Sequence, residues 1–165
     1  MLKESTKLNY LWGGEMVKLN TRNFGEIEID ESSIINFPNG IPGFEKEKRY
    51  IIINNPDKEN PFQWLQSIDN PDLAFVVINP FFVKVDYDIV LPESAIETLK
   101  IKDEEDVALY TIVVIPENIE EMTTNLSGPI VVNVKEKLGK QIVLDDGRYS
   151  TKHYIFKKEL NSEGA

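Results

Sequence analysis

The sequence predicts a mainly β protein: a single small antiparallel β-barrel, closed or nearly closed, with one or two short helices. Three observations support this prediction. Short runs of β-branched and aromatic residues recur along the chain, and clusters of Gly, Pro, Asn and Asp separate them. Only one segment has a convincing helical pattern. The apolar faces of several runs are nearly continuous, and closure into a barrel would remove the edges that such strands otherwise expose.

The length of 165 residues suits one domain, which we expect over residues 16–160, with residues 161–165 as a C-terminal tail. Residues 1–15 show no clear period, and the Gly-Gly-Glu that precedes Met16 is compatible with codons of a purine-rich ribosome-binding site. We therefore expect residues 1–15 to be dispensable, either because they are a disordered extension or because they are non-native and translation starts at Met16.

The expected strands follow from the period of their apolar residues. GEIEID (25–30) alternates Ile with acidic residues, as a half-buried strand does. The later runs are SIINF (33–37), RYIIIN (49–54), AFVVIN (74–79), VALYTIVVI (107–115), PIVVNV (129–134), QIVLDD (141–146) and HYIFKK (153–158). Leu138-Gly139-Lys140 and Asp146-Gly147 are predicted to be hairpin-type connections.

The convincing helix lies around PESAIETLKI (92–101). Pro92 suits a first turn, Glu93 favours the positive helix N-terminus, and Ala95, Ile96 and Leu99 form an apolar face. A second short turn is expected at ENIEEM (117–122).

The composition restricts the class of partner. The net charge is −10, so nucleic acid is a poor direct partner, because phosphate binding relies on clustered Lys and Arg. An acidic surface suits a basic protein partner, or it serves solubility alone. The chain has no Cys and no apolar run near the roughly 18 residues of a membrane helix. We expect a cytoplasmic protein that does not bind membranes.

No catalytic set emerges from the sequence. The single histidine, His153, lies in a strand-like run, and the acidic run 103–106 lacks the spacing of a calcium loop. We therefore expect no enzyme, no metal and no cofactor. Two alternatives stay open: a hydrolase whose two carboxylates meet only in space, and a barrel that holds a small ligand.

The segment FPNGIPGFEKEKRY (37–50) carries two turn signals, Asn39-Gly40 and Pro42-Gly43, within five residues. Two fixed turns lower the entropy cost of presenting an apolar side chain to a partner. The aromatic segment PFQWLQS (61–67) is expected at a loop as well. Our candidate partner-binding residues are Ile41, Phe44, Glu45, Glu47, Phe62, Trp64 and Gln66. The alternative is that these apolar groups fill the barrel and its ends.

Several blocks in this order carry a family resemblance. They are GIPGFE (40–45), PFQWLQS (61–67), LAFVVINP (73–80), TTNLSGPIVVN (123–133) and QIVLDDGRYSTKH (141–153). Together they closely resemble the FliW family of bacterial flagellar assembly factors, over about residues 16–160. The segment before Met16 departs from the family pattern.

The resemblance implies a small β-barrel that is not an enzyme and is a monomer when free. It implies binding to the RNA-binding translational regulator CsrA and to flagellin, near the C-terminal part of flagellin. The implied cycle is partner switching. Accumulated flagellin occupies the assembly factor, and free CsrA then represses flagellin mRNA. Secretion of flagellin frees the factor to capture CsrA, and translation resumes.

Overall fold

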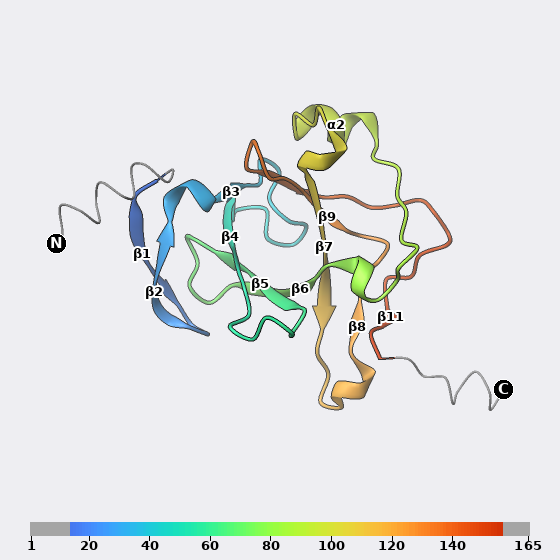
Figure 1. The fold of residues 1–165 in the computed structure, drawn as a ribbon, viewed down its shortest axis with the longest axis horizontal. Coiled ribbons are helices and arrows are strands. Elements are labelled where there is room, and N and C mark those ends of the chain that lie inside the picture. The colour runs from blue at the N-terminus through green and yellow to red at the C-terminus, as the bar shows by residue number, and fades with distance from the viewer. Residues whose placement is uncertain (1–13, 157–165) are drawn as a thin grey trace.

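The computed structural model describes residues 14–156 of the chain (Figure 1). The expectations for the N-terminal extension and for residues 161–165 therefore fall largely outside the described part. Within it, the Glu15 carbonyl accepts a backbone hydrogen bond from Glu31 at 2.9 Å, which continues the first hairpin by one residue before Met16.

Seven strands form a ring, which confirms the predicted barrel-like β fold. In the order in which they neighbour one another they are β3 (Ile35–Asn36), β4 (Arg49–Ile53), β5 (Phe62–Ser67), β6 (Ala74–Ile78), β7 (Val107–Val114), β9 (Ile130–Asn133) and β10 (Leu138–Gln141). The ring closes where β10 returns to β3. That pairing, between Leu138 and Asn36, is parallel, whereas the other pairings in the ring are antiparallel.

Further elements lie outside the ring. A separate hairpin of β1 (Met16–Thr21) and β2 (Gly25–Asp30) lies at the left of Figure 1. The strands β8 (Thr123–Thr124) and β11 (His153–Tyr154) extend the sheet beyond β7. The helix α2 (Glu93–Thr98) lies at the top of Figure 1. The 3₁₀ turns in the described part of the chain are η1 (Glu31–Ser33), η2 (Pro80–Phe82), η3 (Glu104–Asp106) and η4 (Ile119–Glu121).

The inside of the ring is filled by side chains. Phe37, Tyr50, Leu65, Val77 and Ile130 are fully buried there and belong to one apolar cluster. The Phe37 and Tyr50 rings meet edge to face with centroids 5.0 Å apart. Dense packing of this kind stabilises one unique arrangement of strands.

The outside of the ring is covered in two places. Leu19 and Ile29 of the β1–β2 hairpin pack against Ile51 of β4. Ala95 of α2 and Leu99, which caps its C-terminus, pack against Val131 of β9 on another part of the wall. The hairpin alternates because only one of its faces meets the barrel, which is why GEIEID has the period of a half-buried strand.

Several expectations are corrected. Within the segment 61–67, Phe62–Ser67 form strand β5 rather than a loop. Leu138-Gly139-Lys140 belongs to strand β10, and the connection before it turns at Lys137, whose φ is 56°. Asp146-Gly147 lies in a turn, but the flanking strands do not pair with each other, because β11 pairs with β8. The strand expected at residues 141–146 therefore begins and ends earlier, at Leu138 and Gln141.

Candidate protein-binding site

The loop between β3 and β4 is held by its own backbone. The N–H of Gly40 donates to the carbonyl of Phe37 at 2.9 Å, and the N–H of Phe44 donates to the carbonyl of Ile41 at 2.7 Å. The N–H of Glu47 then donates to the carbonyl of Phe44 at 3.1 Å. Three successive turn bonds leave this loop, residues 37–48, little freedom to rearrange.

The turns require glycine and an acidic side chain. Gly40 has a φ of 65°, and a Cβ on it would lie 2.6 Å from the Cα of Glu45. Gly43 has a φ of 90°, and its N–H donates to both carboxylate oxygens of Glu45, at 2.7 and 3.1 Å. Glu45 thus stabilises the turn that presents Phe44, in addition to placing a negative charge beside it.

The two apolar residues of the loop face opposite environments. Ile41 is 1% exposed and joins the barrel core. Phe44 is 43% exposed, and the buried part of its ring meets Phe75 edge to face, with centroids 5.2 Å apart. Ile41 therefore anchors the loop, while Phe44 offers an apolar surface in a fixed position.

A charge and a buried hydroxyl lie beneath this loop. Glu47 is half-buried and accepts a long hydrogen bond of 3.4 Å from the Ser67 hydroxyl. Burial, with a smaller contribution from the charge of Glu47, raises the pKa of Tyr50 to about 12. Among the described residues the Tyr50 hydroxyl finds no hydrogen-bond partner. Tyr50 therefore stays neutral and acts as an apolar ring in the core.

The three candidates from residues 61–67 lie on the outer face of β5, away from the core residue Leu65. Phe62 packs in a cluster with Ile78 and Met122. Trp64 meets Phe24 edge to face, with centroids 4.9 Å apart. Phe62 and Trp64 are both half-buried.

Gln66 is fully buried, and its Nε2 lies within 3.0–3.4 Å of the carbonyl oxygens of Ser67, Asn70, Pro71 and Leu73. It holds the β5–β6 connection from within. The structure thus brings Ile41, Phe44, Glu45 and Glu47 together in one loop. The β5 residues lie on a strand, with Gln66 beneath the surface.

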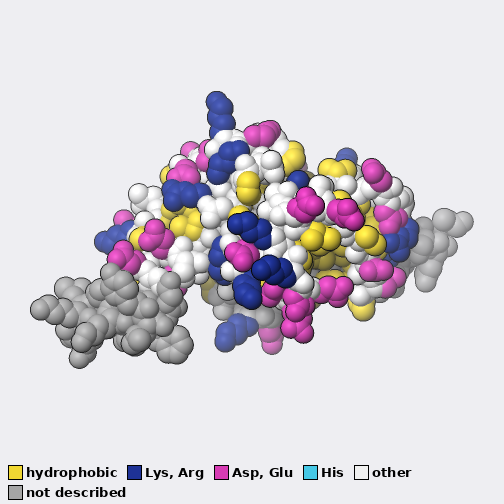
Figure 2. Space-filling model, turned by 90° about the horizontal axis from the view of Figure 1, so that it is seen from above, with side chains coloured by type: hydrophobic (Ala, Val, Ile, Leu, Met, Phe, Trp, Pro, Cys, Tyr) yellow, Lys and Arg dark blue, Asp and Glu magenta, His cyan; other side chains and the backbone are white. Residues whose placement is uncertain are grey.

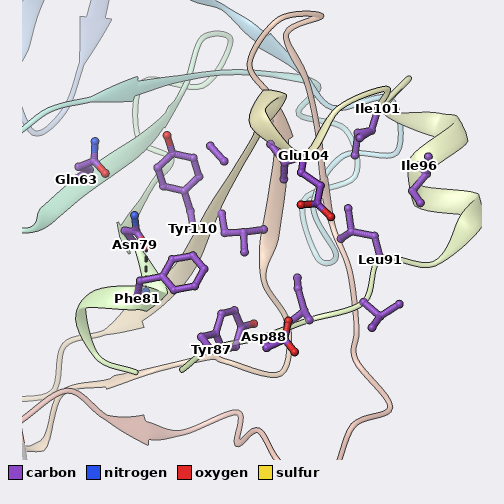
Figure 3. A pocket seen from close by; sticks show the side chains of 15 residues that line it. Gln63, Asn79, Phe81, Tyr87, Asp88, Leu91, Ile96, Ile101, Glu104 and Tyr110 are labelled. Carbon is purple, nitrogen blue, oxygen red and sulfur yellow. Dashed lines mark hydrogen bonds between the residues drawn. The ribbon is translucent and has the colours of Figure 1, made fainter. Parts of the chain in front are cut away.

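Sequence reasoning missed a second surface. An open groove of about 870 Å³ lies beside β7, and we call it the β7 groove (Figure 3). It is lined by Gln63, Asn79, Phe81, Tyr87, Asp88, Ile89, Val90, Leu91, Ile96, Ile101, Glu104, Val107, Ala108, Leu109 and Tyr110. Figure 2, seen from the side of α2, shows hydrophobic side chains gathered in a hollow with Asp and Glu around it. The available signal in the sequence was the mixture of apolar and acidic residues at 86–106.

Other kinds of chemistry find little support in this geometry. Within residues 14–156, no group of three or more His, Cys, Asp or Glu is arranged to hold a metal ion. The barrel interior is filled by side chains such as Phe37 and Leu65. That part of the chain also has no helix with the length and hydrophobicity that a membrane crossing requires.

The comparisons with known proteins agree with this fold. A family model described as FliW protein matches residues 18–155. The flagellar assembly factor FliW of Alkaliphilus metalliredigens is 54% identical over 140 residues, which cover 85% of this chain and 86% of that protein. The protein of the same name from Caldanaerobacter subterraneus is 46% identical, with 88% and 97% covered. A crystal structure of a flagellar assembly factor FliW matches with a TM-score of 0.80 and 42% identity over 87% of this chain and 99% of that one. The chain therefore belongs to the FliW family of flagellar assembly factors.

Proposed function

We propose that this protein is a non-enzymatic flagellar assembly factor that binds two protein partners in turn. One is a CsrA-type RNA-binding regulator, and the other is flagellin, through the C-terminal part of flagellin. Binding to CsrA relieves the repression of flagellin mRNA, and binding to flagellin prevents that relief. The free protein is a cytoplasmic monomer. Membership of the FliW family supports this proposal.

The observation that carries the proposal is the exposed Phe44 on a pre-organised loop. Aromatic side chains with a buried base and an exposed face are favoured anchors of protein interfaces. The loop is already ordered by the turn bonds of Gly40, Phe44 and Glu47, so binding loses little further conformational entropy. A protein that must release one partner to take another benefits from such a low cost of ordering.

The charge of the protein supports the choice of a basic partner. The chain has a net charge of −10, and Glu45 and Glu47 lie beside Phe44. Opposite charges on two proteins raise the rate at which they meet, and their effect falls with ionic strength. An acidic protein docked on an RNA-binding surface, or next to one, also lowers the affinity of that surface for phosphate.

Competition between purified partners tests the proposal. CsrA, flagellin mRNA leader and this protein are mixed, and RNA binding is followed by fluorescence anisotropy. We expect the protein to release RNA from CsrA, and added flagellin to restore RNA binding. The association rate with CsrA should fall several-fold between about 0.05 and 0.5 M salt, over which the Debye length shrinks about threefold.

Two outcomes would contradict the proposal. RNA that stays bound to CsrA at any concentration of this protein rules out antagonism. An unchanged association rate across the salt range shows that the acidic surface does not steer binding, which would leave solubility as its role.

A further inference from the structure

The β7 groove lies next to an incomplete seam in the barrel wall. Strand β6 pairs with β7 at only two positions, Val77 with Ile112 and Ile78 with Thr111. It ends there because Pro80 starts the turn η2, and proline donates no backbone hydrogen bond. Among the described residues, the groove side of Val107–Tyr110 therefore has no neighbouring strand.

The backbone of β7 shows which groups point into the groove. The carbonyls of Asp106 and Ile112 accept hydrogen bonds from Val134 and Asn125, on the β9 and β8 side. Backbone groups of alternate residues in a strand point to the same side. Those of the odd-numbered residues therefore point to the groove. The N–H of Val107 already donates a hydrogen bond to the carbonyl of Glu104. Leu109 is therefore the residue that presents both its N–H and its carbonyl to an occupant of the groove.

The walls of the groove are held in place without an occupant. The Tyr87 hydroxyl donates to the carbonyl of Leu126 at 2.6 Å. The Tyr149 hydroxyl lies 2.8 Å from both the N–H and the carbonyl oxygen of Asp88. On the other side, the Asn133 side chain donates to the carbonyl of Leu99 at 2.8 Å, which holds the end of α2. The groove is thus preformed, and it exposes apolar groups such as Ile96.

The charge around the groove favours a basic occupant. Residues 86–106 contain eight carboxylates and two lysines. Asp88 and Glu104 line the groove itself. In Figure 3 the Glu104 side chain lies in the upper part of the groove and the Asp88 side chain in the lower part. A segment that crosses the groove would therefore meet negative charge near each end.

We propose that the β7 groove binds an extended segment of a partner protein as an added strand on the β7 edge. The segment is apolar at alternate positions and carries Lys or Arg at its ends. An extended segment fits better than a helix, because a helix has already paired its own backbone groups and would leave those of Leu109 unmet. The inference goes beyond the proposed function, since it names a surface that shares no residue with the loop of Phe44.

Synthetic peptides test this mode of binding. Three probes alternate Val with Thr, Ile with Ser, and Leu with Gln, and each has a pair of Lys at both ends. Binding is followed by anisotropy and by amide chemical shifts of the isotope-labelled protein. We expect shifts at Leu109 and its neighbours, and at least about a tenfold loss of affinity when alternate peptide nitrogens are methylated, because methylation removes the donors that pair with a strand.

Matched variants locate the site. Ile96→Lys places a positive charge in the groove and should weaken binding of the Lys-ended peptides. Ile119→Lys makes the same change at another exposed isoleucine, on η4, and should leave it unaltered.

Three results would overturn the proposal: no shift at Leu109 with any probe, equal affinity of the methylated peptides, or tighter binding of a peptide with the same residues rearranged at helical spacing. The outcome is separate from that of the competition with CsrA and flagellin, because the probes contain neither protein.

Discussion

Replacing Phe44 with alanine separates a binding anchor from a core residue. Phe44 is 43% exposed, so its replacement by alanine removes only half of the roughly 3 kcal/mol that full burial of a phenylalanine side chain contributes to stability. The edge-to-face contact with Phe75 adds about 0.5–1 kcal/mol. No cavity term applies, because the ring lies at the surface. The variant should therefore lose about 2 kcal/mol of unfolding free energy.

The matching core variant provides the scale. Phe37 is fully buried against Tyr50, and Phe37→Ala should cost about 3–5 kcal/mol. Phe82→Ala is a surface control, since Phe82 is 69% exposed on η2. Urea unfolding gives the stability of each variant, and titration calorimetry of the same samples gives the affinity for CsrA and for flagellin.

We expect Phe44→Ala to weaken binding of at least one partner by about 2 kcal/mol, or about thirtyfold, while it stays folded. Phe82→Ala should bind both partners at the original strength. If Phe44→Ala loses as much stability as Phe37→Ala, the ring is a core residue. If it binds both partners unchanged, the loop of residues 37–48 is not the contact surface.

Three other perturbations have clear expectations. Glu47→Lys should slow association with CsrA more than Glu136→Lys, which makes the same charge change on the β9–β10 turn; equal rates in stopped-flow mixing would count against steering by this loop. Tyr50→Phe should raise the unfolding free energy in urea by about 1 kcal/mol, because it removes a buried hydroxyl that has no hydrogen-bond partner among the described residues. A loss of stability would show that the hydroxyl does form a hydrogen bond. The Arg49 guanidinium donates hydrogen bonds to the Asp69 carboxylate and lowers the pKa of that carboxyl. The pair therefore stabilises the fold at pH values above the ordinary carboxyl pKa, and this stabilisation is lost as the pH falls through the lowered pKa. Asp69→Asn should thus lower the unfolding free energy by less than about 1 kcal/mol at neutral pH, because the pair is exposed, and should leave it unchanged in strong acid. An equal loss at both pH values in urea unfolding would refute the link between this pair and the pH dependence of stability.

The barrel could be predicted because its strands follow simple rules. Runs such as residues 49–53 and 107–114 are rich in β-branched and aromatic residues, and turn residues bound them. The helix α2 followed from Pro92 and from the spacing of its apolar residues. These signals are local, so a single sequence contains them.

The errors arose where distant parts of the chain decide the structure. The sequence predicts a loop where strand β5 lies, yet the Gln66 side chain of this strand is buried beside the backbone carbonyls of Ser67 and of three residues in the connection to β6. The sequence predicts a hairpin-type connection at Leu138-Gly139-Lys140, where strand β10 lies. In the structure the absent side chain of Gly139 makes room for the Phe37 ring, which a Cβ would meet at 2.5 Å.

The candidate site could be predicted only in part. The double turn was readable from Asn39 to Gly43, but the sequence does not show that Ile41 points inward while Phe44 points outward. That difference depends on the bridge between the two residues and on Phe75, which belongs to another strand. The β7 groove depends on where β6 stops pairing with β7, a long-range property that no local pattern records.

The parallel pairing of Leu138 with Asn36 has a consequence for the order of folding. Strands β3 to β6 can form a meander as they leave the ribosome, but both edges of that meander stay open until β7, β9 and β10 have been synthesised. Contacts between residues far apart in the sequence slow folding, and open edges of a growing sheet can pair with other chains. The newly made protein thus passes through a stage in which it is most prone to aggregate, and a truncation before β9 would hold it there.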